Sequence, residues 1–149
     1  MKRLLILCAM AALAACASNL KQTDAERLAL YRANAGEPVR DFQYFGSLNG
    51  WTPLGNSALV VWTRPNQAYL LELSGPCNDL DFATAIGVTN HMGRVSARFD
   101  DVRVFGGGHS GIRIPCRIQT IRPLDVKAVK AAQQELRQAQ VVEREAAGN

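Results

Sequence analysis

The sequence contains few residues of the kinds that build metal and redox centres. It has two histidines, His91 and His109, and four cysteines. Neither type occurs at the paired H-x-x-x-H or C-x-x-C spacing of zinc sites and dithiol motifs. The G-x-x-x-x-G-K-[ST] pattern of a phosphate-binding loop is also absent. The sequence therefore predicts no metal site, no cofactor and no nucleotide-driven chemistry.

Long hydrophobic runs are equally scarce. The single extended run, Leu4 to Ala15, has twelve residues and follows Lys2 and Arg3. A helix that spans a membrane needs about twenty apolar residues. A short apolar run behind a positively charged start is typical of a secretory signal. Residues 1–15 are therefore predicted to be a cleaved signal peptide.

The end of this run adds a more specific signal. Leu13-Ala14-Ala15-Cys16 resembles the lipobox of bacterial lipoproteins. The resemblance implies that Cys16 receives a lipid on its thiol, becomes the first mature residue and is acylated again, and two or more chains hold a protein firmly on a membrane. Ala17, where an Asp would favour retention in the inner membrane, implies a protein at the periplasmic face of the outer membrane. Residues 16–22 are then a lipidated tether.

Excess charge of one sign is lacking as well. The chain has 17 basic and 13 acidic residues, and cleavage would remove Lys2 and Arg3 with no acid. The mature chain would keep 15 basic against 13 acidic residues, a net charge of +2. A nucleic-acid partner is not expected, because it would require both a basic patch and access to nucleic acid.

The cysteines separate by position. Cys8 would leave with the signal and Cys16 would carry lipid, which leaves Cys77 and Cys116 in an oxidising compartment. These two residues are expected to form a disulfide. Closing a loop of about forty residues should stabilise the fold by roughly 4 kcal/mol on the chain-entropy account.

Helix signals lie on both sides of a β-rich middle. Thr23-Asp24-Ala25-Glu26 has the spacing of a capping box, which predicts a helix that ends near Gly36 and Pro38. Asp125 can cap a second, longer helix. That helix carries a thin apolar stripe made of Val129, Ala132, Leu136 and Ala139.

Residues 39–122 consist of short apolar segments separated by turn signals. Arg64-Pro65-Asn66-Gln67 predicts a hairpin, and Asn49-Gly50 predicts another. Such spacing is typical of a small antiparallel barrel or sandwich, here of about six to eight strands. The chain is thus predicted to be mainly β, with a helix plus β-rich domain over residues 23–123 and a C-terminal helix over residues 124–149.

The last strand has an informative alternation. Ile112, Ile114, Cys116 and Ile118 share one parity, which predicts that they point inward. Ile121 breaks this parity, so a bulge is expected near Gln119 or Thr120.

The middle of the chain is similar to a group of small proteobacterial envelope lipoproteins classed as a domain of unknown function. The resemblance covers roughly residues 40–123. It implies an envelope location and two paired cysteines, and it brings no catalytic residues. It is carried by Tyr69 to Leu73, Cys77, Leu80, Ala85 to Gly87, Phe99 to Val104, and Cys116-Arg117-Ile118.

Five arginines fall on predicted strands at outward positions and could gather on one face: Arg94, Arg98, Arg103, Arg113 and Arg117. Guanidinium groups bind phosphate and carboxylate well. A solvated face balanced by acids is the simpler interpretation. The favoured function is a non-enzymatic, lipid-anchored domain that binds an envelope protein or an anionic glycan.

Two other functions stay open. A small envelope hydrolase would use His91 and His109 with Asp100 or Asp101. However, Gly108-His109-Ser110-Gly111 is one residue short of a nucleophile elbow, and Gly106 to Gly111 is interpreted as a hairpin tip. A structural lipoprotein would instead use the C-terminal helix for assembly.

Overall fold

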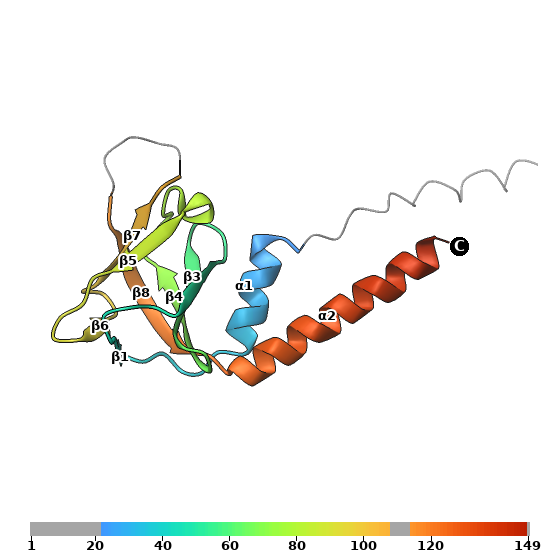
Figure 1. The fold of residues 1–149 in the computed structure, drawn as a ribbon, viewed down its shortest axis with the longest axis horizontal. Coiled ribbons are helices and arrows are strands. Elements are labelled where there is room, and N and C mark those ends of the chain that lie inside the picture. The colour runs from blue at the N-terminus through green and yellow to red at the C-terminus, as the bar shows by residue number, and fades with distance from the viewer. Residues whose placement is uncertain (1–21, 108–113, 149) are drawn as a thin grey trace, which may run out of the picture.

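The computed structural model describes residues 22–107 and 114–148. Over these residues it confirms a mainly β fold with a short first helix and a longer last helix (Figure 1). The helices are α1 (Asp24–Ala33) and α2 (Val126–Ala147), and a 3-10 turn, η1 (Leu80–Phe82), precedes β5. The strands are β1 (Asp41–Gln43), β2 (Gly50–Pro53), β3 (Ala58–Arg64), β4 (Gln67–Leu73), β5 (Ala85–Val88), β6 (Arg94–Ser96), β7 (Asp101–Phe105) and β8 (Cys116–Pro123).

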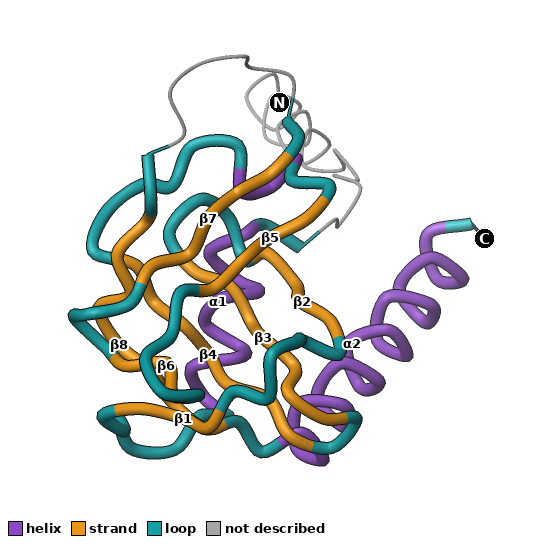
Figure 2. The backbone as a smooth tube through the Cα atoms, turned by 60° about the vertical axis from the view of Figure 1, so that its left-hand side comes forward, coloured by secondary structure: helices purple, strands orange, loops and turns teal. Residues whose placement is uncertain are grey.

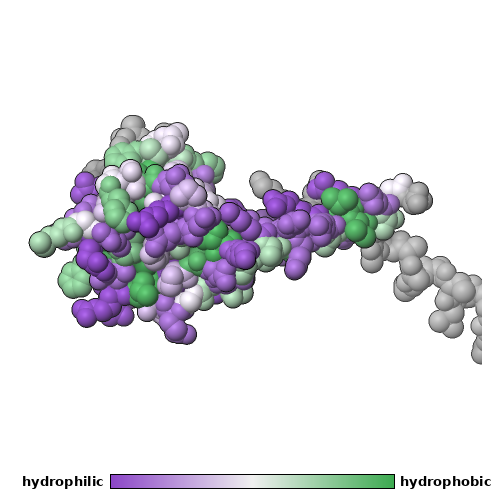
Figure 3. Space-filling model, turned by 60° about the horizontal axis from the view of Figure 1, so that its bottom comes forward, coloured by the Kyte–Doolittle hydropathy of each residue, from purple (hydrophilic) through white to green (hydrophobic). Residues whose placement is uncertain are grey.

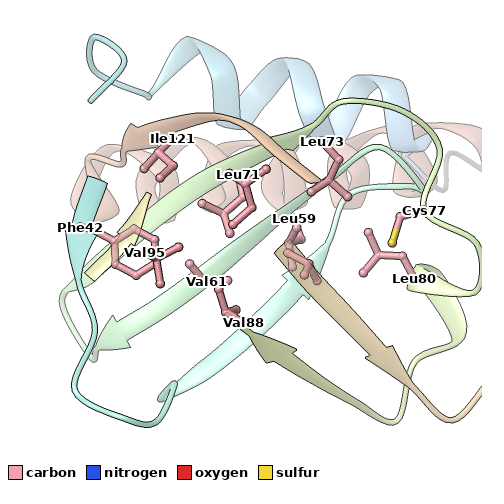
Figure 4. Close-up of a cluster of buried hydrophobic side chains, with 12 residues drawn as sticks. Phe42, Leu59, Val61, Leu71, Leu73, Cys77, Leu80, Val88, Val95 and Ile121 are labelled. Carbon is pink, nitrogen blue, oxygen red and sulfur yellow. The ribbon is translucent and has the colours of Figure 1, made fainter. Parts of the chain in front are cut away.

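Six strands form one antiparallel sheet in the order β2-β3-β4-β8-β7-β5, which curls into a half-barrel (Figure 2). β1 and β6 form a second, two-stranded sheet. Side chains from both sheets meet in the main core (Figure 4). There, Phe42 of β1 stacks on Tyr69 of β4 with ring centroids 4.6 Å apart. The small sheet therefore helps to cover the concave side of the large one.

The other face of β3 and β4 carries a second core. Val60 and Leu70 point away from the half-barrel and pack against the two helices. Tyr31 of α1 lies in this cluster, and its hydroxyl accepts a hydrogen bond of 2.9 Å from Gln133 of α2. Because β3 is buried on both faces, its sequence reads as a continuous apolar run. α1 and the first turn of α2 thus cover the outer face of the sheet.

Several short-range predictions are confirmed. The Thr23 hydroxyl accepts from the backbone N–H of Glu26 at 3.2 Å, and the Glu26 carboxylate accepts from the backbone N–H of Thr23 at 2.8 Å. Asp125 caps α2 by accepting from the N–H of Ala128 at 2.9 Å. The hairpin of β3 and β4 closes with Arg64 opposite Gln67.

The predicted bulge is also present. Thr120 lies opposite Glu72 and Ile118 lies opposite Leu73, so Gln119 is the extra residue in β8. This insertion lets both Ile118 and Ile121 point into the core, where neither is exposed.

Two expectations are wrong. Asn49-Gly50 does not join β1 to β2; β1 pairs with β6, and β2 begins at Gly50. Burial of Phe42 opposite Val95 outweighs the local turn preference. Ile114 does not point inward but is 73% exposed, because β8 begins only at Cys116.

Candidate functional site

The Cys77–Cys116 disulfide is present, with the Cα atoms 5.6 Å apart. It joins the loop after β4 to the first residue of β8. Cys77 is fully buried beside Leu80 in the main core (Figure 4). The bond therefore belongs to the framework of the fold, and neither sulfur is a free thiol.

The glycine-rich loop lies largely outside the described residues. These exclude residues 108–113, and with them His109, Ser110 and Arg113. The flanking strands β7 and β8 pair antiparallel, with Asp101 opposite Arg117, as expected on either side of a hairpin. Of the two histidines in the hydrolase hypothesis, the structure therefore describes His91 and its surroundings.

Asp100, the acid proposed to orient a catalytic histidine, is fully buried. One carboxylate oxygen accepts from the Thr89 hydroxyl at 2.8 Å, and the other accepts from the backbone N–H of Ser96 at 2.8 Å. His91 lies beside it, with Nδ1 3.6 Å from Oδ1 and with the imidazole 85% exposed. That separation exceeds a normal hydrogen bond. The sequence did not predict a structural role for Asp100. Its hydrogen bonds to Thr89 and Ser96 show that it stabilises the conformation of residues 89–101.

His91 and Asp100 have no third potential metal ligand beside them among the described residues. Within residues 22–107 and 114–148, no three His, Cys, Asp or Glu side chains are grouped so that they could hold a metal ion. His91 and Asp100 are therefore a two-residue contact at a loop.

The arginines that were predicted to share one face come together only in part, and two of them are paired with acidic side chains. Arg94 donates from Nε to Asp41 at 2.9 Å across the β1–β6 ladder. Arg117 donates from Nε to Asp101 at 2.7 Å. The sequence did not show which acids pair with these arginines, because Asp41 lies 53 residues from Arg94 along the chain and Asp101 lies 16 residues from Arg117.

Three of the arginines come together at the start of β7 and β8. Arg117 donates from Nη1 to the backbone oxygen of Arg98 at 2.9 Å. Arg103 lies two residues after Asp101 on the same outer face of β7. Arg98 and Arg103 are exposed and make no ion pair within the described residues.

A groove lies between α1 and α2. The two helices meet near Tyr31 and Gln133, and α2 then projects beyond α1 and the sheet (Figure 1). The groove has a volume of about 440 Å³. It is lined by Gln22, Glu26, Leu30, Leu136, Ala139, Gln140 and Glu143.

The composition of this groove is specific. Its apolar part consists of Leu30 on α1 with Leu136 and Ala139 on α2, and each helix adds one carboxylate, Glu26 or Glu143. Figure 3 shows the projecting part of α2 as a largely hydrophilic arm with apolar side chains near its far end. The sequence predicted the apolar stripe on α2 but not the contribution of α1 to the groove. The sequence feature that indicates this contribution is the i, i+4 spacing of Glu26 and Leu30, which places both side chains on one face of α1.

Glu26 has a pKa below the usual value of 4.5, because the backbone N–H and the hydroxyl of Thr23 both bind its charged form. A lowered pKa means that the ionised group stabilises the fold above the ordinary pKa, and this contribution is lost as pH falls through the lowered value. We therefore expect Glu26→Gln to flatten the loss of thermal stability between neutral and acidic pH. Melting curves of both proteins across this range test this.

Comparison with known proteins gives a family and no activity. The model of a family described as "Family of unknown function (DUF6491)" matches residues 1–140. No curated protein and no solved structure matches the chain. In the part of the chain that the structure describes, neither helix has the length and apolar character needed to cross a bilayer.

Proposed function

Because the chain belongs to this family of unknown function, we propose its function from its own surfaces. It is a lipid-anchored domain at the periplasmic face of the outer membrane, and it binds an envelope protein through the groove between α1 and α2. The observation that carries the proposal is the open apolar wall of α2, which continues beyond the β domain and leaves Leu136 37% exposed.

The chemistry of the groove indicates its occupant. Leu30, Leu136 and Ala139 offer apolar contact along helical walls, a geometry that suits an amphipathic helix. Glu26 and Glu143 place negative charge on both sides. An anionic glycan would be repelled there. The favoured partner segment is therefore a basic amphipathic helix, with lysine or arginine beside its apolar stripe.

A synthetic amphipathic peptide with leucines at i, i+3, i+4 and i+7 and flanking lysines tests this chemistry. We expect it to bind the full chain, and we expect Leu136→Asp to weaken binding by about tenfold or more. A buried leucine side chain contributes roughly 1.5–3 kcal/mol, and an aspartate would add a desolvation cost. Fluorescence anisotropy of the labelled peptide gives the affinity.

Two matched controls sharpen this experiment. Val141→Asp makes the same change at a 52% exposed position, about 140° around the helix from Leu136, and should leave binding unchanged. A peptide with glutamates in place of the lysines should bind more weakly. Equal binding of both peptides, or equal loss in both variants, would contradict the proposed site.

The lipid anchor has its own test. We expect wild-type chain expressed in a Gram-negative host to incorporate labelled palmitate and to sediment with outer membranes, because Cys16 completes the lipobox-like Leu13-Ala14-Ala15-Cys16. Cys16→Ser should lose the label and the outer-membrane association, whereas Cys8→Ser should retain both. Labelling that persists in Cys16→Ser would refute the anchor without affecting the groove.

A further inference from the structure

A second exposed surface lies at the side of the half-barrel where β7 begins. Phe99 lies on this surface, two residues before β7, and is 76% exposed. Arg98, the residue before it, has a φ of 68°, in the left-handed region that non-glycine residues rarely adopt. The backbone beside Phe99 therefore adopts an energetically unfavourable conformation. The large apolar ring of Phe99 remains mostly exposed among the described residues. The same connection between β5 and β7 also exposes Met92 completely.

Arginines lie beside the backbone segment that precedes this ring. The backbone N–H of Ala97 donates to the oxygen of Arg40 at 2.9 Å, which places Arg40 beside the segment that carries Arg98. Arg117 reaches the same segment through its bond to the oxygen of Arg98. We call Arg40, Arg98, Phe99, Arg103 and Arg117 together the Phe99 surface.

Most of the arginines on this surface have no acidic partner among the described residues. Asp101 is paired with Arg117, and Asp100 is buried and bound by its own loop. Arg40, Arg98 and Arg103 are exposed and form no ion pair within the described residues. The Phe99 surface therefore combines one exposed aromatic ring with three exposed arginines that form no ion pair within the described residues.

We propose that the Phe99 surface contacts an anionic phospholipid bilayer. Phe99 enters the interfacial layer, where aromatic side chains are favoured, while the arginines bind headgroup phosphates. An anionic polysaccharide would satisfy the arginines but offers no apolar phase for the ring. This contact goes beyond the proposed groove function and requires neither the groove nor a lipid on Cys16.

Photocrosslinking tests the contact residue by residue. Benzoylphenylalanine is placed at position 99 of the full chain and, separately, at position 82. Phe82 is also 76% exposed, but it precedes β5, and β5 and β7 run antiparallel, so the two positions lie at opposite ends of this strand pair. Each protein is irradiated with vesicles of phosphatidylcholine, or of phosphatidylcholine and phosphatidylglycerol in equal parts.

We expect phospholipid adducts at position 99 in the anionic vesicles and few at position 82. Arg40→Gln combined with Arg98→Gln should reduce the yield at position 99 to its level in pure phosphatidylcholine. Equal yields at both positions, no lipid adduct at position 99, or a yield indifferent to the arginines would each overturn the proposal. An adduct-free position 99 together with arginine-dependent binding of a soluble anionic polysaccharide would identify a glycan surface in its place.

Discussion

Loss of the disulfide through Cys77→Ala with Cys116→Ala is expected to lower the free energy of unfolding by about 4 kcal/mol. The bond closes a loop across a sequence separation of 39 residues, and a loop of this size restricts the unfolded chain by about that amount. The loop contains β5, β6 and β7. Without the bond, the attachment of this half of the fold to β4 depends on packing and hydrogen bonds alone.

Denaturant unfolding followed by circular dichroism measures the change. Reduction of the wild-type protein should shift the midpoint by the same amount as the double substitution, and reduction should leave the double variant unchanged. A wild-type midpoint that is indifferent to reduction would show that the two cysteines are not bonded.

Asp100→Ala is expected to destabilise the protein by about 3 kcal/mol. The substitution leaves the Thr89 hydroxyl and the Ser96 N–H without their acceptor, and each buried unsatisfied group costs roughly 1–3 kcal/mol. Residues 89–101 should loosen, and with them the pairing of β6 to β1. Hydrogen exchange at the amides of β1 and β6 would report this loss locally.

Substitutions around Asp100 separate a structural acid from a catalytic one. Asp100→Asn keeps an acceptor oxygen and should cost less than Asp100→Ala. His91→Ala should change stability little, because its ring is 85% exposed and does not hydrogen-bond the acid. A loss of stability in His91→Ala as large as that in Asp100→Ala would contradict this assignment, because it would mean that the two side chains stabilise the fold as a pair.

The sequence predicted the local features of this fold well. Capping by Thr23 and Asp125 depends on hydrogen bonds that span three residues. The bulge at Gln119 follows from the need of Ile118 and Ile121 to share one core. Such features are visible in sequence because each depends on near neighbours.

Features that depend on distant neighbours were missed. The partner of β1 is β6, more than fifty residues along the chain, and burial of Phe42 decided that pairing. The groove combines Leu30 with Leu136, so neither helix alone reveals it. The outward parity of the arginines predicted their exposure, but Asp41 and Asp101 became their partners only through strand pairing.

In the proposed function, a basic amphipathic segment of an envelope protein occupies the groove between α1 and α2. Its most direct test is photocrosslinking in intact cells, with benzoylphenylalanine at position 136 and, as a control, at position 141. We expect one defined protein adduct at position 136, which maps by mass spectrometry to a basic amphipathic helix, and little adduct at position 141. Adducts of equal yield at both positions, or an adduct at position 136 that maps to an acidic segment or to lipid alone, would contradict it.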